Sequence, residues 1–208
     1  MKTSVPQISS SDTTHNPSNA SPALTTITPG STAYGWPCIS GTTCNGTAAN
    51  PYLIRGITLS SPSDVMTLYG GPNVNQPVYY DVDSISMSGQ SQLAVSGYIV
   101  LNVKTSLSLT GKGIVNGITE APEAVQINYA GTSDGHIGGN GAMSAVVTAP
   151  NANVVLGGGG SSGYMVGSIQ ANNVTVQGGY PIHYDIQLSR LGGTIGTMVV
   201  TSYMRRKL

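Results

Sequence analysis

Three residues near the end of the chain, His183, Tyr184 and Asp185, have side chains of the types that acid–base chemistry uses. His183 and Asp185 are two positions apart, so on a β-strand both side chains would project from one face. A catalytic histidine also needs a nucleophile within hydrogen-bond distance, and no serine in a glycine-flanked elbow accompanies this pair. We therefore expect the three residues to form a polar structural cap on the last repeat, with acid–base catalysis as the alternative.

Asp81 and Asp83 form a second pair whose spacing places both side chains on one face of a strand. Two carboxylates could bind Ca²⁺, as in some solenoid lyases, but a calcium site takes six or more oxygen ligands. The remaining acidic residues are scattered along the chain, and no acidic repeat supplies further ligands. We interpret the pair as solvated carboxylates that discourage edge pairing, and we predict no metal, no cofactor and no catalytic centre.

The two cysteines, Cys38 and Cys44, are separated by five residues that include Gly41. In an oxidising compartment this spacing predicts a disulfide that closes a short loop. Two free thiols are the alternative. No further cysteine or nearby histidine supports a zinc site.

The composition favours an all-β, extracellular protein. Only 8% of the 208 residues are charged and the formal net charge is zero, whereas an average soluble domain is about 25% charged. Nucleic-acid binding needs a basic surplus, so we expect no nucleic-acid partner. The longest apolar runs are too short to span a membrane. The first residues lack the apolar core of a signal peptide, so we expect that export would involve a leader that has been removed.

Three regions follow one another along the chain. Residues 1–33 are polar and aperiodic and predict a disordered-like linker or stalk. Residues 34–76 predict a short, irregular, loop-rich cap, in which residues 63–69 are a helix candidate. Residues 77–208 contain short alternating apolar runs, which predict a β-solenoid domain.

Each of these runs closes on a glycine, at positions 89, 111, 139, 158 and 178. The last repeats align at an offset of 20, which pairs position 146 with 166, 153 with 173, 154 with 174 and 156 with 176. Repeats of this length cannot bury their own apolar residues, but stacked coils align them into one core. We predict a right-handed parallel β-helix with valine and leucine inside and stacked asparagines at positions 153 and 173. An antiparallel sandwich, whose strands also recur with turns, is the alternative.

Three stretches together resemble a known group of proteins: residues 78–89, residues 147–156, and the run Ile182-His183-Tyr184-Asp185 followed by Leu188. In this order they are similar to the uncharacterised C-terminal domain of bacterial PilX-type proteins, which are related to type IV pilus assembly. The chain departs from that pattern at Ile186, where an acidic residue is common, and by having no hydrophobic pilin helix at its start. The resemblance implies a surface or pilus context and no known enzymatic activity.

These observations predict a non-catalytic, exported bacterial module with a structural or adhesive role at the cell surface or on a pilus. Its partners would be other pilus or surface proteins, further copies of itself, or a glycan surface. Two alternatives stay open. One is a polysaccharide-active β-helix enzyme, which would need clustered carboxylates, and the other is a solenoid whose serine- and threonine-rich face binds a glycan or another ordered surface.

Overall fold

The computed structural model describes residues 26–27, 46–62, 64–116, 121–158, 162–185 and 188. Apart from one 3-10 turn, Pro122–Ala124 (η2), the regular elements among these residues are strands. The strands are β1 (Thr26–Ile27), β2 (Tyr52–Leu59), β3 (Val65–Tyr69), β4 (Val78–Met87), β5 (Gln92–Ser96), β6 (Ile99–Leu109), β7 (Ile114–Asn116), β8 (Val125–Tyr129), β9 (Gly135–Ile137), β10 (Ala142–Leu156), β11 (Tyr164–Val176) and β12 (Ile182–His183).

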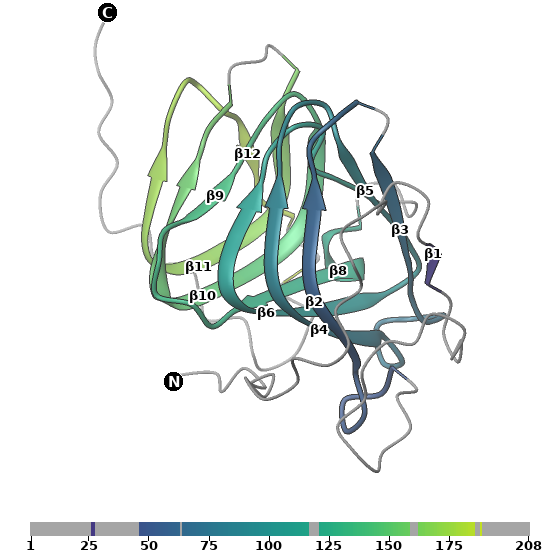
Figure 1. Ribbon diagram of the computed structural model, residues 1–208. Coiled ribbons are helices and arrows are strands. Elements are labelled where there is room, and N and C mark those ends of the chain that lie inside the picture. The colour runs from purple at the N-terminus through teal and green to yellow at the C-terminus, as the bar shows by residue number, and fades with distance from the viewer. Residues whose placement is uncertain are drawn as a thin grey trace, which may run out of the picture.

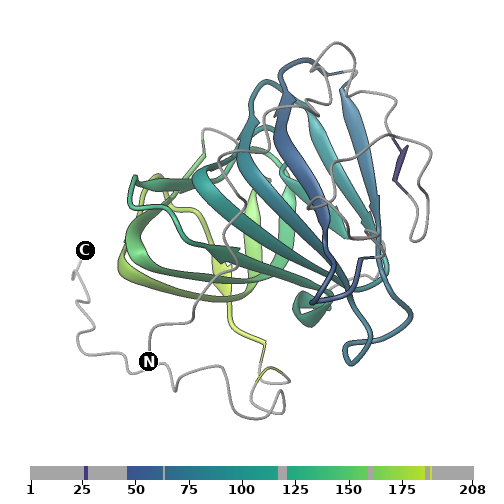
Figure 2. The same cartoon turned by 60° about the horizontal axis from the view of Figure 1, so that its bottom comes forward.

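The strands stack into a parallel β-solenoid of about four turns. Strands β2, β4, β6, β8, β10, β11 and β12 lie side by side in one sheet, β9 joins its edge between β6 and β10, and β1, β3, β5 and β7 form the second sheet. Figures 1 and 2 show the long curved strands of the first sheet following one another along the stack. All pairings between these strands are parallel, which excludes the antiparallel sandwich.

The solenoid includes residues that precede the predicted boundary at position 77. Strand β2 pairs with β4 and β3 pairs with β5, so both belong to the same two sheets as the later coils. The helix expected at residues 63–69 is wrong, because the described part of that segment forms β3. Met66 and Leu68 are buried in the core and alternate with more exposed neighbours. This two-residue period of burial is that of a strand and not of a helix.

The repeat alignment is confirmed in the second half of the last coil. Asn153, Val154 and Leu156 pair with Asn173, Val174 and Val176. In the first half the alignment is wrong by two positions, because Val146 pairs with Ser168. The register shifts between Ala149 and Asn153. Such an irregularity disrupts the ladder locally and changes the offset within a single strand, after which the pairing resumes.

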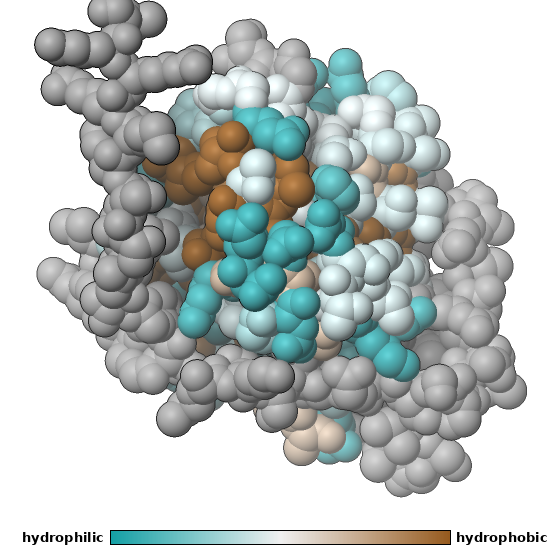
Figure 3. All heavy atoms as spheres, turned by 90° about the vertical axis from the view of Figure 1, so that its left-hand side faces the viewer, coloured by the Kyte–Doolittle hydropathy of each residue, from teal (hydrophilic) through white to brown (hydrophobic). Residues whose placement is uncertain are grey.

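The apolar side chains of the last coil are more exposed to solvent than those of the coil before it. Val154 and Leu156 are fully buried, whereas their register partners Val174 and Val176 are 38% and 49% exposed. The expectation that all four side chains are buried is therefore wrong for β11. Figure 3 shows hydrophobic atoms gathered on this side of the molecule, with polar atoms beside them.

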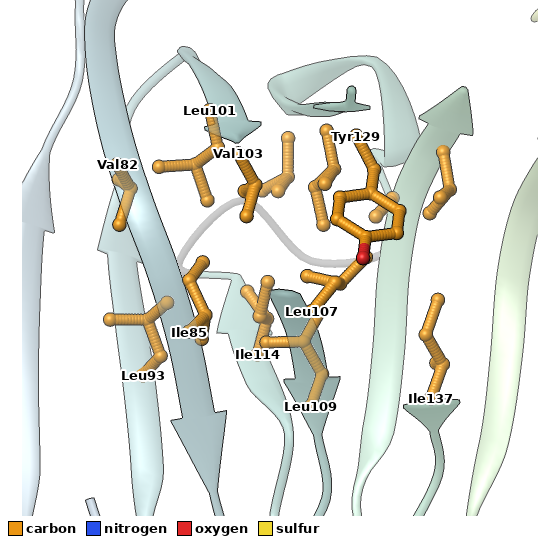
Figure 4. Packing of buried hydrophobic residues seen from close by; sticks show 14 of the residues in the cluster. Val82, Ile85, Leu93, Leu101, Val103, Leu107, Leu109, Ile114, Tyr129 and Ile137 are labelled. Atoms are coloured by element: carbon orange, nitrogen blue, oxygen red, sulfur yellow. The ribbon is translucent and has the colours of Figure 1, made fainter. Parts of the chain in front are cut away.

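The core is a continuous column of aliphatic side chains with a few tyrosines. Figure 4 shows inward residues of successive coils packing against each other, with Tyr129 among them. The chain has no phenylalanine, so tyrosines supply the large aromatic volume, and their hydroxyls need partners inside the core. The Tyr80 hydroxyl donates to the Tyr69 carbonyl oxygen at 2.6 Å, and the Tyr129 hydroxyl lies 3.0 Å from the carbonyl oxygens of Thr105 and Ser133.

The predicted closing glycines form one corner of the solenoid. Gly111 and Gly139 lie on neighbouring coils and have φ angles of +82° and +110°. A Cβ atom on Gly139 would overlap the carbonyl oxygen of Gly111, and one on Gly111 would lie 3.1 Å from that of Gly89. Glycine is therefore required here both by the left-handed backbone and by the close approach of the coil below.

We predict that Gly139→Ala lowers the free energy of unfolding by about 3 kcal/mol or more, since it combines backbone strain with a clash against Gly111. Gly113→Ala is the matched control, because Gly113 also has a positive φ of +67° but its Cβ would meet nothing within 4 Å. The control should lose only about 1–2 kcal/mol. Urea unfolding of both variants measures the difference, and equal losses would contradict the role of the corner.

Candidate functional site

A row of outward-facing side chains runs across the coils, three positions before each closing glycine. The row consists of Ser86, Ser108, His136, Val155 and Thr175, and each residue is the register partner of the next. Parallel strands lie about 4.8 Å apart, so neighbouring side chains in the row stand next to each other. Ser108 and His136 are thereby brought together although 27 residues separate them in the sequence.

A groove of about 430 Å³ lies over the part of this row next to the glycine corner. Its lining comes from the ends of β6, β9, β10 and β11 and comprises Ser108, Thr110, His136, Ile137, Val155, Gly157, Gly158, Gln177 and Gly178. The three glycines have no side chains, so the surface is hollowed where the row meets the corner. The same backbone requirement that closes each coil thus also shapes the groove.

The groove offers neutral hydrogen-bonding groups. Ser108 provides a hydroxyl, and His136 and Gln177 are exposed and provide an imidazole and an amide. The Thr110 hydroxyl donates to the carbonyl oxygen of Met87, which fixes its orientation. Among the described residues that line the groove, none carries a carboxylate, ammonium or guanidinium group. This lining suits a ligand rich in hydroxyl groups better than an ion.

Ser108 and His136 are also the residue types of a nucleophile and a general base. In the described structure no hydrogen bond joins them. Asp134 lies directly before β9, two positions from His136, and its carboxylate accepts a hydrogen bond from Asn153 Nδ2 at 3.0 Å. Ser108 and His136 are therefore register partners without the bonded arrangement that orients a catalytic histidine.

The groove is not predicted by an alignment of the last repeats at a constant offset of 20, which does not pair Ser108 with His136. Ser108 and His136 differ by 28 positions, which is the longest step between closing glycines. The signal was present in another form, since both residues stand three positions before a closing glycine. Aligning on the glycines instead of on a constant offset recovers the whole row.

The predicted cap residues lie at the end of the solenoid. His183 belongs to β12, pairs with Val166 of β11, and its ring stands edge-on to Tyr164 with the ring centroids 5.9 Å apart. Tyr184 is exposed, and the Asp185 carbonyl oxygen accepts the backbone N–H of Leu188 at 3.1 Å. None of the three is among the described residues that line the groove, and their capping role stays a prediction.

The structure separates Asp81 from Asp83. Asp81 is only 3% exposed, whereas Asp83 is half-buried, and the register shifts between Val82 and Ser84. The interpretation of both as solvated carboxylates is therefore wrong for Asp81. Among the described residues, no group of three or more histidine, cysteine, aspartate or glutamate side chains could hold a metal ion.

Asp81 is the first member of a buried hydrogen-bonded ladder. Asn102 Nδ2 donates to Asp81 Oδ1 at 2.7 Å, and Asn128 Nδ2 donates to Asn102 Oδ1 at 3.0 Å. These three residues are register partners on β4, β6 and β8. The Asn102 amide donates to one coil and accepts from the next, so the ladder fixes these three coils against each other.

A second ladder begins at Asp134. Asn153 Nδ2 donates to Asp134 Oδ1, and Asn172 Nδ2 donates to Asn153 Oδ1 at 3.1 Å. The asparagine ladder predicted at positions 153 and 173 is therefore correct for Asn153, but its side-chain partner is Asn172. The backbone partner, Asn173, is not the donor of that bond.

Cys38 and Cys44 lie outside the described residues, so their disulfide stays a prediction.

Within the described ranges, the chain forms no helix with the length and hydrophobicity that a membrane crossing requires.

The groove, the glycine corner and both ladders lie within residues 73–191, and this span matches the domain of unknown function DUF7305. The chain belongs to the DUF7305 family. No curated protein and no solved structure matches it. The DUF7305 span begins after β2 and β3, although both strands are continuous with the stack.

Burial raises the pKa of the Asp81 carboxyl above its ordinary value of 3.8, and the hydrogen bond from Asn102 opposes this only in part. The folded protein therefore holds this proton to higher pH than the unfolded chain does. The contribution of Asp81 to the free energy of unfolding is largest below about pH 3.8 and falls as the pH rises through the raised pKa of the folded state.

We predict that Asp81→Asn stabilises the DUF7305 domain at neutral pH, because it removes a buried charge and keeps the oxygen that accepts from Asn102. The advantage should shrink as the pH is lowered toward 3.8, which urea unfolding of both proteins from pH 3.5 to 7 would measure. Asp81→Leu is the control, since it leaves the Asn102 amide without its partner and should be less stable than Asp81→Asn by about 1–3 kcal/mol at every pH. A stability difference between Asp81→Asn and the native chain that does not vary with pH would contradict the argument.

Proposed function

We propose that the chain is a non-catalytic structural or adhesive module, exported by a bacterium and carried at the cell surface or on a pilus. The observation that supports this most directly is the outer row that includes Ser86, Ser108 and Thr175. These three side chains carry hydroxyl groups, and the positions of the row repeat at the spacing of the strands. A rigid stack with such a face is suited to contact an extended, regular surface.

The surface context rests on two further observations. The three stretches that resemble PilX-type proteins lie in strands β4, β10 and β12 or directly beside them, and so fall in the solenoid itself. The chain is also poor in charge and has as many basic as acidic residues. Both features fit a module that is carried on an assembly outside the cell.

The groove favours a glycan as the adhesion target. Its hydroxyl, amide and imidazole groups can exchange hydrogen bonds with sugar hydroxyls, while Val155 and Ile137 offer apolar contact to the faces of the rings. A polysaccharide-active enzyme is the second candidate, and the juxtaposition of Ser108 with His136 is the observation that favours it. The two candidates use one groove but differ in whether the ligand is turned over.

We expect the purified chain to be retained by a bacterial or host polysaccharide in a panel of immobilised glycans. Ser108→Tyr should reduce that retention about tenfold or more, because its ring would fill the groove, and a loss of that size corresponds to about 1.4 kcal/mol. Ser86→Tyr places the same ring in the same row but outside the groove. This matched control should keep full retention.

The same preparations test for catalysis. We expect no release of sugars or of ester groups from the retained glycan. Turnover that disappears in His136→Ala, while the circular dichroism spectrum and melting temperature stay unchanged, would assign the chain to the enzymes. Equal retention of Ser108→Tyr and Ser86→Tyr would show that the groove is not the adhesion site.

A further inference from the structure

The second ladder (Asp134, Asn153 and Asn172) lies beside the outer row over which the groove extends. Asn153 stands two positions before Val155 on β10, and Val154 between them is fully buried in the core. Alternate residues of a strand project from opposite faces, so Asn153 and Val155 both project outward. The ladder therefore runs parallel to the row, two positions from it along the strand.

The glycine corner lies on the opposite side of the same row. Thr110 and Gly157, which line the groove, stand two positions after Ser108 and Val155 of the row. Figure 1 shows β9, β10 and β11, the strands that carry this surface, side by side at one end of the solenoid. The row thus has the hollowed corner on one side and the amide and carboxylate groups of the second ladder on the other.

The side chains of the second ladder have hydrogen-bonding groups to spare. Asp134 and Asn172 are exposed, and Asn153 is half-buried. Each asparagine amide has two N–H groups, and each donates one of them within the ladder. Within the described part of the chain, the second N–H of each amide and the Oδ1 atom of Asn172 have no protein partner. The ladder therefore offers donors and acceptors at the surface.

The hydrogen bonds within the ladder also hold these groups in place. Asn153 is fixed from both sides, since it donates to Asp134 at 3.0 Å and accepts from Asn172 at 3.1 Å. Groups that are already oriented lose little conformational entropy when a ligand binds. A hydroxyl both donates and accepts hydrogen bonds, so an oriented line of donors and acceptors suits the neighbouring hydroxyls of a sugar ring.

The direction in which the surface chemistry repeats indicates the direction of a polymeric ligand. Along the stack, the ladder repeats over three coils, and the groove takes its lining from four strands, which together span about 14 Å. Along β10, by contrast, the surface changes from amide at position 153 to apolar at 155 and glycine at 157. A polymer of repeated sugars therefore meets repeated contacts only along the stack.

We propose that the second ladder is the polar wall of the groove and determines its sugar specificity. A linear glycan lies along the stack, with successive sugars on successive coils. The apolar faces of its rings contact Val155, and their hydroxyl groups exchange hydrogen bonds with Asn153 and its neighbours in the ladder. This inference rests on the adhesive function proposed above and adds the residues that recognise the sugar and the direction of the chain.

Asn172→Leu tests the ladder, because it removes the last amide and leaves the bond between Asn153 and Asp134 intact. We expect the Kd for the retained glycan to rise about fivefold or more, as for the loss of one or two hydrogen bonds. Asn128→Leu is the matched control, since Asn128 ends the first ladder in the same way and lies outside the groove. It should bind with native affinity. Calorimetric titration gives both Kd values and melting curves show that both variants are folded; equal Kd values would overturn the proposal.

Oligosaccharides cut from the same glycan test its direction on the native chain. The Kd should fall with each added sugar up to about four, because the groove crosses four strands, and affinity that stops rising before the third sugar would overturn the arrangement along the stack. Ser108 lies on β6 and Asn172 on β11. A tetrasaccharide weakened by Ser108→Tyr but not by Asn172→Leu would overturn the proposal and leave the groove as the adhesion site, whereas binding of no glycan would overturn the proposed function itself.

Discussion

The parallel hydrogen-bonded ladder between successive coils is the constraint on which the rest of this structure depends. It holds each residue about 4.8 Å from its partner on the next coil, so every position is repeated as a column through the stack. Several columns keep one kind of chemistry, with aliphatic side chains in the core, glycine at the corner, and aspartate followed by asparagines in each amide ladder. Because Gly139 approaches Gly111 so closely, the corner column sets how tightly the coils can stack. The side chains of the core, the outer row and the groove therefore all repeat at the spacing between the strands.

The same constraint explains why each amide ladder begins with an aspartate. In a column of asparagines every Nδ2 donates to the coil before it and every Oδ1 accepts from the coil after it. The first member needs no donor group, because no asparagine precedes it in the column; the register partner before Asp81 is Leu53. A group that only accepts is sufficient there, and a carboxylate is one. Asp81 accepts from Asn102 in this way at the cost of burying its charge, which shows how strongly the column limits the choice of residue.

Much of the fold was predictable from the sequence because columns leave a repeated pattern. The closing glycines and the alternating valines and leucines predicted a parallel stack, and the pairing of Val154 with Val174 is confirmed. What failed were features that depend on a changing offset. The shift after Ala149 moves the partner of Val146 by two positions, and the long step to His136 hid its proximity to Ser108. The burial of Asp81 was also missed, because alternation along a strand predicts which face a residue occupies but not whether that face is covered.

The low charge of the chain gives the end of the stack particular importance. Inside a solenoid each coil protects the edge and the apolar face of its neighbour, but the last coil has no neighbour, and repeat proteins generally require a terminal cap for solubility. Charged residues on an edge strand are one common protection against association. β11 carries none from Tyr164 to Val176, and the net charge of zero provides little repulsion between molecules. Among the described residues β12 pairs only with the start of β11, so the rest of this edge lacks both the pairing that protects the inner coils and the charge that protects many edge strands.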